Sequence, residues 1–118
     1  HLTVEHVLPQ SWGAHWPIDP EHELPEEVRV ELKAAREAHV HRLGNLTLAT
    51  KKLNPSVGNG AWAKKMAGLN DHSILHLNRD LVEDHPTEWT EADIDSRGED
   101  LAELVTRHWP GPEAWPQL

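Results

Sequence analysis

Residues 2–10 have the sequence Leu-Thr-Val-Glu-His-Val-Leu-Pro-Gln, which places a carboxylate and an imidazole side by side in an apolar run. The β-branched residues around the pair favour a short strand, and Pro9 should end it because proline cannot donate to a sheet ladder. In a regular strand Glu5 and His6 point to opposite faces. We therefore expect Glu5 to hold a metal ion on one side of a reacting bond and His6 to address a water molecule on the other. An ordinary half-buried histidine beside an exposed glutamate is the alternative.

The length and composition limit the kind of protein this is. The chain has 118 residues, enough for one domain with a modest core. It has no Cys, which excludes disulfides and thiolate zinc sites and agrees with a reducing cytoplasm. Any metal ion must bind His, Asn, Asp or Glu, and such ligands suit Mg²⁺ or Mn²⁺ better than a closed zinc site. With no targeting segment and no apolar run of about 18 residues, we expect a cytoplasmic domain cut from a longer chain, without a membrane span.

The charge is unevenly distributed. The net charge of -9 argues against a nucleic-acid partner. However, residues 38–70 contain no Asp or Glu, while acidic residues concentrate in 19–37 and 83–103. The basic residues of the acid-free stretch are Arg42, Lys51, Lys52, Lys64 and Lys65. We expect this stretch to create a locally positive potential that attracts phosphate. The alternative is that the two acidic segments are ordinary solvated helix faces and that the stretch between them lacks acidic residues by chance.

Helical and strand patterns follow in order along the chain. Pro25 and the two glutamates after it predict a helix to about Ala38, because proline suits the first turn and acids face the positive end of the helix dipole. Alternating apolar and small polar residues predict a second strand over 43–50, entered through Gly44. Further helices are predicted over 61–69, 73–82 and 90–108. Asn54-Pro55 is a predicted turn or helix start, and Thr90 with Asp93 forms a near capping box.

Two basic features have more than one interpretation. Arg97 falls on the same apolar side of its helix as Ile94 and Leu101, so it is either a snorkelling core residue or a phosphate contact at the rim. His39 and His41 form a His-x-His pair that could bind a transition metal. His41, beside the second strand, could instead help to position phosphate.

Three of these segments together resemble the HNH (His-Me finger, ββα-metal) nucleases. They are Val4–Trp12, Leu43–Leu48, and Asn54, which follows Asn45 by nine residues. The closest likeness is to the C-terminal HNH domain of GmrSD-type, modification-dependent restriction enzymes, which have a Glu-His-Ile-Leu-Pro-Gln start and a Gly-Asn-Leu-Thr-Leu second strand. The likeness extends through residues 77–81 and 89–109 and thus covers nearly the whole chain.

The resemblance implies a fold and a set of site residues. The fold would be α+β and mostly helical, with a ββα-metal core of two short antiparallel strands and a helix, plus additional packing helices. Residues 1–118 would form a single nuclease domain, the C-terminal part of a longer protein. By the resemblance His6 is the general base, Glu5 and Asn54 hold one divalent ion, Mg²⁺ or Mn²⁺, and Asn45 orients His6. From the residues alone, Asn54 could merely cap the helix at Pro55, and Asn45 could merely satisfy the turn at Gly44.

The same resemblance implies a metal-dependent DNA endonuclease that nicks or cuts double strands as the effector of a restriction or anti-phage system. An upstream nucleotide-hydrolysing sensor domain in the same protein would license it. Contacts would go to the phosphate backbone with little sequence specificity. The candidate DNA-binding residues are His41, Arg42, Lys51, Lys52, Asn59, Lys64, Lys65 and Arg97. The rival hypothesis is a catalytically inactive DNA- or protein-binding module built on the same fold.

Overall fold

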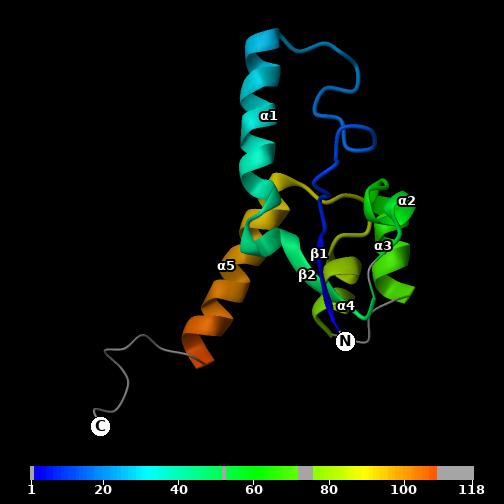
Figure 1. Cartoon of the computed structure of the whole chain (residues 1–118). Helices are drawn as coiled ribbons and strands as arrows, with labels where there is room; N and C mark the ends of the chain where they lie inside the picture. Colours follow the sequence, from blue (N-terminus) through cyan, green and yellow to red (C-terminus); the bar gives the residue numbers. More distant parts are fainter. Residues whose placement is uncertain (1, 52, 72–75, 109–118) are drawn as a thin grey trace.

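A computed structural model describes residues 2–51, 53–71 and 76–108 (Figure 1). It combines a two-stranded antiparallel sheet with a majority of helix, which confirms the predicted α+β class. The elements in chain order are β1 (Thr3–His6), α1 (Glu26–Val40), the 3-10 turn η1 (Leu43–Asn45), β2 (Leu46–Ala49), α2 (Pro55–Gly58), α3 (Trp62–Asp71), α4 (His76–Asp84) and α5 (Glu91–His108). Part of the helix predicted over 73–82 lies outside the described residues.

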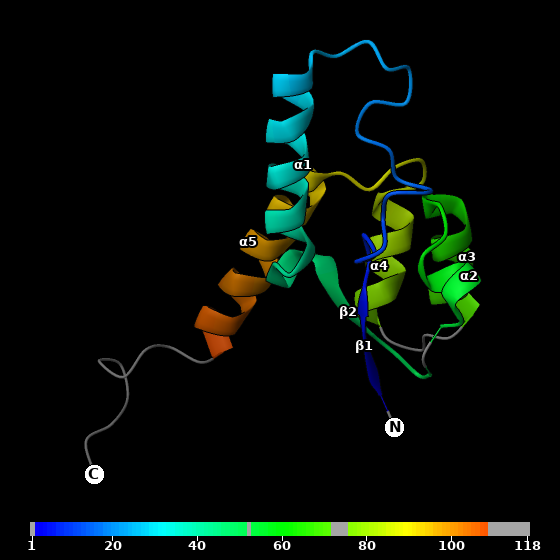
Figure 2. The ribbon, with the colours of Figure 1, turned by 45° about the horizontal axis from the view of Figure 1, so that its top comes forward.

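The two strands cross the middle of the molecule, and the helices lie on either side of them. The helices α2, α3 and α4 gather on one side, while α1 and α5 extend on the other (Figures 1 and 2). The register pairs Glu5 with Thr47 and His6 with Leu46. The ladder continues beyond β1, because Val7 N donates to Asn45 O at 2.8 Å. The two segments that carry the sequence motif are therefore neighbours in space.

The start of the second strand differs from the prediction. Residues 43–45 form η1, and the strand begins at Leu46. The cause is the tight packing of this segment against α5: a Cβ on Gly44 would lie 1.8 Å from the backbone oxygen of Ile94. Arg97 Nη1 also donates to Gly44 O and Leu46 O, at 2.7 and 2.8 Å. These carbonyls are satisfied by a side chain from α5 instead of by a strand partner.

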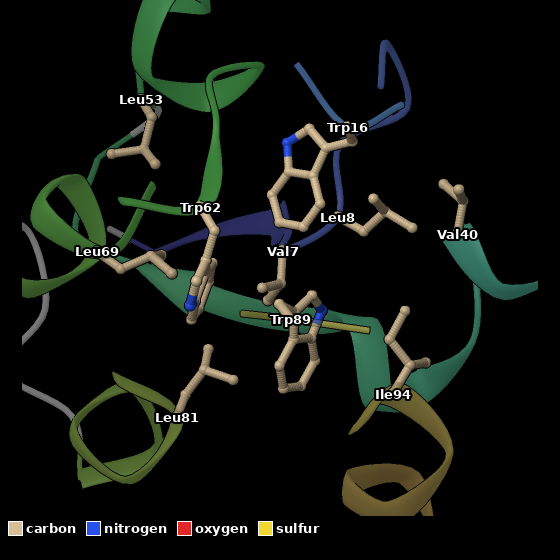
Figure 3. Packing of buried hydrophobic residues seen from close by; sticks show 10 residues of the cluster. All are labelled: Val7, Leu8, Trp16, Val40, Leu53, Trp62, Leu69, Leu81, Trp89 and Ile94. Atoms are coloured by element: carbon tan, nitrogen blue, oxygen red, sulfur yellow. The ribbon is translucent and has the colours of Figure 1, made fainter. Parts of the chain in front are cut away.

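Three tryptophans dominate the core between the sheet and the helices (Figure 3). Trp62 stacks on Trp89 with ring centroids 5.9 Å apart, and Trp16 meets Trp62 edge-on at 6.3 Å. Buried indole N–H groups need acceptors. They find them at the backbone oxygens of Gly60 and His85, for Trp16 and Trp62, and at the side chain of Asn45, for Trp89. The chain has no Phe or Tyr, so tryptophan supplies all of the bulky aromatic packing.

The long helices α1 and α5 begin and end close to where their sequence signals predict. Helix α1 starts at Glu26, with Pro25 at its N-cap instead of at the first helical position. At the start of α5, Thr90 N donates to Asp93 Oδ2 at 2.8 Å and Asp93 N donates to Thr90 Oγ1 at 3.2 Å, which confirms the capping box. Within the described ranges, no helix has both the length and the apolar character to cross a bilayer.

Candidate active site

A polar cleft of about 430 Å³ opens at the end of β1. Its walls come from the end of β1 and the residues after it, from the α2 region, and from α3. The lining residues are Val4, Glu5, His6, Pro9, Gln10, Ser11, Leu53, Pro55, Gly58, Asn59 and Lys65. Glu5 and His6 both border this cleft although they are consecutive in a strand.

His6 is half-buried and contacts a second histidine. Its Nε2 lies 3.1 Å from Nδ1 of His41, and the two rings meet edge-on with centroids 5.1 Å apart. Burial lowers the pKa of His6 below its ordinary value of 6.5, and the neighbouring His41 and Lys65 lower it further, whereas Glu5 opposes the shift. A lowered pKa keeps the imidazole neutral at pH 7, which is the form that can accept a proton.

The carboxylate of Glu5 is held by the segment between β2 and α2. Its Oε1 accepts a hydrogen bond from Leu53 N at 3.2 Å, and its Oε2 lies 3.8 Å from Lys65 Nζ. Its side chain is only 12% exposed. One oxygen is thus fixed by the backbone, while the other lies beside a cation at the wall of the cleft.

Lys65 lies inside the protein, which corrects the prediction of an exposed DNA contact. The residue is 1% exposed, and its Nζ donates to Gly58 O at 2.5 Å. Burial lowers its pKa, and the neighbouring Glu5 opposes that shift. Helix α3 turns this face toward Leu53 and the cleft, because Trp62 and Leu69 on the same helix are core residues. The burial gives Lys65 a role in shaping the cleft wall around Glu5.

Asn45 is fully buried, and its side chain contacts the chain after His6, not the imidazole. Its Oδ1 accepts from Leu8 N at 2.7 Å and from Trp89 Nε1 at 3.0 Å. Its Nδ2 donates to the backbone oxygens of Leu8 and Val40, at 2.9 and 2.8 Å. The structure therefore places Asn45 as a clamp that joins the loop after β1, the end of α1 and the tryptophan core.

Asn54 is the N-cap of α2, as one of its two interpretations predicted. Its Oδ1 accepts from Val57 N at 3.2 Å and from Ser56 Oγ at 2.6 Å, and it is not among the residues that line the cleft. In the described ranges, no three His, Asp or Glu side chains are grouped to hold a metal ion. The donors at the cleft fit a hard divalent ion that keeps most of its waters and takes one carboxylate oxygen, that of Glu5. They do not form a closed cage.

The remaining DNA-binding candidates divide into two arginines that bond to other parts of the protein and residues for which no such contact carries the assignment. Arg42 pairs with Asp95 on α5 at 2.7 Å, and Arg97 uses its guanidinium for the backbone of η1 and β2. Burial lowers the pKa of Arg97. Arg97 is therefore a core residue, as one of its two interpretations predicted, but its guanidinium binds backbone oxygens instead of reaching water, whereas Arg42 stays exposed. Lys51 and Lys64 are exposed, Asn59 lines the cleft, and Lys52 lies outside the described residues.

Gln10 and Ser11 line the cleft next to His6 and were not among the predicted site residues. The signal that could have identified them is their position immediately after Pro9, within the same motif as the Glu-His pair. A strand that ends at a proline must turn away, and the first residues of that turn border the same opening. Both side chains offer hydrogen bonds to a bound substrate.

Comparison with known families found a match along most of the chain. The model of the C-terminal domain of the GmrSD restriction endonucleases matches residues 1–104. No curated protein and no solved structure matched the chain. The matched range contains both strands, every residue that lines the cleft, and most of α5. Because the match spans most of its 118 residues, the chain belongs to the family of GmrSD restriction endonuclease C-terminal domains.

Proposed function

We propose that this domain is a metal-dependent DNA endonuclease of the HNH type, the effector of a restriction or anti-phage system. The observation that carries the proposal is the pair Glu5 and His6, which border one polar cleft as a half-buried carboxylate and an imidazole of lowered pKa. Membership in a restriction endonuclease family makes DNA the substrate that suits this cleft. Hydrolysis of a phosphodiester needs both of the functions that such a pair can supply.

In this mechanism His6 is the general base. Its unprotonated ring nitrogen takes a proton from a water molecule in the cleft, and the resulting hydroxide attacks phosphorus. A general base of this kind contributes about 10²–10⁴-fold to a rate. The lowered pKa of His6 supports this role, because it favours the neutral ring at pH 7. Gln10 and Ser11 are placed to hydrogen-bond the phosphate oxygens beside it.

Glu5 would hold one divalent ion, Mg²⁺ or Mn²⁺, at the opposite side of the scissile bond. When bound, such an ion supplies positive charge that stabilises the leaving oxygen. Leu53 N fixes one oxygen of Glu5, which leaves the other as the ligand. Asn54 would add a second ligand only by giving up its cap on α2. The neighbouring Lys65 places a second cation beside the same carboxylate.

DNA would bind through its phosphates with little sequence specificity. Lys51 and Lys64 are exposed, and Asn59 borders the cleft. On a chain of net charge -9, intrinsic affinity for DNA should be weak and depend steeply on salt. This weakness supports an upstream nucleotide-hydrolysing sensor domain in the same protein that delivers the substrate.

The experiment is plasmid nicking and linearisation by the 118-residue chain across a series of Mg²⁺ and Mn²⁺ concentrations. His6→Ala is compared with His15→Ala, a matched change in an exposed loop histidine. We expect cleavage that requires the metal and falls by ~10²-fold or more in His6→Ala alone. DNA binding without cleavage at any metal concentration would instead favour the inactive DNA- or protein-binding module.

A further inference from the structure

His41 lies at the C-terminal end of α1, and the fold fixes it against His6 from two sides. Asn45 Nδ2 donates both to Val40 O, the residue before His41, and to Leu8 O, two residues after His6. The same side chain therefore ties together the two segments that carry the two imidazoles. Although His41 itself is exposed, its backbone is anchored by a residue that is fully buried.

Contacts from α5 hold the end of α1 on the other side. Asp95 accepts from Arg42 Nη1 at 2.7 Å and lies 3.0 Å from His39 Nε2. Hydrogen bonds from these two residues, His39 first, lower the pKa of Asp95, so the carboxylate is charged at neutral pH. His39 and Arg42, which lie on either side of His41 in the sequence, thus both contact α5, and the imidazole of His41 contacts His6 on β1.

The 3.1 Å separation of His6 Nε2 and His41 Nδ1 requires one proton between the two nitrogens. If His6 donates, Nε2 carries the proton and the free lone pair of His6 is on Nδ1. If His41 donates, His6 carries its proton on Nδ1 and has no lone pair left for a water molecule. The two arrangements therefore differ in whether His6 can act as a base.

We propose that His41 is the positioning residue of His6: it accepts a hydrogen bond from Nε2 and leaves Nδ1, on the ring that lines the cleft, as the basic atom. This inference rests on the proposed function and deepens it. It gives His41 the task that resemblance assigned to Asn45, whose own hydrogen bonds go to the backbone and to Trp89. It also replaces the expectation that His41 contacts phosphate.

Two variants separate the hydrogen bond from the ring contact. His41→Phe keeps a flat ring against His6 but removes the acceptor. His41→Gln removes the ring but retains an amide oxygen that can accept from Nε2. His15→Phe, in the exposed loop, is the matched control for the change of histidine to phenylalanine.

The first measurement is the tautomer of His6, read from long-range proton–nitrogen correlation spectra of the ¹⁵N-histidine-labelled chain and assigned with His6→Ala. We expect the parent and His41→Gln to hold His6 with its proton on Nε2, and His41→Phe to give a mixture of both forms. A parent spectrum with the proton on Nδ1, or a spectrum that His41→Phe leaves unchanged, would overturn the inference.

The second measurement is single-site cleavage kinetics of the same variants. His41→Phe should lower kcat by about 10-fold or more with little change in KM, since a base loses orientation while DNA contacts remain. His41→Gln should recover most of kcat, and His15→Phe should match the parent. An unchanged kcat in His41→Phe would remove His41 from the mechanism. If the parent itself cleaves no DNA, the proposed function fails, whereas the tautomer spectrum still decides the His6–His41 hydrogen bond.

Discussion

Asn45→Ala should be among the most destabilising single changes in this protein. The substitution removes the acceptor of two buried donors, Leu8 N and Trp89 Nε1, and the donor to the backbone oxygens of Leu8 and Val40. Leaving a buried polar group without a partner costs about 1–3 kcal/mol. The two N–H groups alone therefore predict a loss of roughly 2–6 kcal/mol, against a total free energy of unfolding of about 5–15 kcal/mol for a typical domain.

The assay is urea unfolding followed by tryptophan fluorescence, which is sensitive here because Trp89 is both a core residue and a partner of Asn45. The matched control is Asn70→Ala on the exposed face of α3, which should change the free energy of unfolding by less than about 0.5 kcal/mol. We expect a lower midpoint for Asn45→Ala with an unchanged slope. A loss of unfolding free energy below about 1 kcal/mol, or one equal to that of Asn70→Ala, would show that Asn45 does not act as a clamp.

Four further predictions test the site and its surroundings. Burial lowers the pKa of His6 below 6.5, and a base works when deprotonated, so the cleavage rate should rise with pH through a midpoint below 6.5; a midpoint at or above 6.5 would contradict the burial argument. Asn54→Ala should lower stability by about 1 kcal/mol through the lost cap, measured by thermal melting, and a raised metal requirement for cleavage would show that Asn54 also binds the ion. Removing Lys51 and Lys64 together should weaken cleavage of unrelated DNA sequences alike and flatten the logarithmic salt slope by up to about 2, whereas an unchanged slope would place the phosphate contacts elsewhere. Gly44→Ala should destabilise the domain by about 1–3 kcal/mol or more in the same urea assay, because its Cβ would overlap a backbone oxygen of α5, and a neutral result would mean that the segment can shift.

Local sequence signals determined much of the fold. The helix start at Pro25, the cap at Asn54 and the capping box of Thr90 with Asp93 all depend on residues within a few positions of one another. The apolar run that contains Glu5 and His6 likewise predicted β1 and the position of the candidate site. Signals of this kind can be recognised without the rest of the chain, because a cap or a strand end satisfies its own backbone groups.

The polar contacts between distant segments were decided by the tertiary structure alone. Lys64 and Lys65 are adjacent lysines of the same helix, yet the orientation of α3 exposes the first and buries the second. His41 makes the contact with His6 that was expected of Asn45, because the end of α1 lies beside β1 although it comes from a distant part of the sequence. Arg97 likewise finds its acceptors about fifty residues away in η1 and β2. Sequence spacing carries information on hydrogen bonds within a turn or a helix, whereas contacts between distant segments depend on how the whole core packs, which here is set by the three tryptophans.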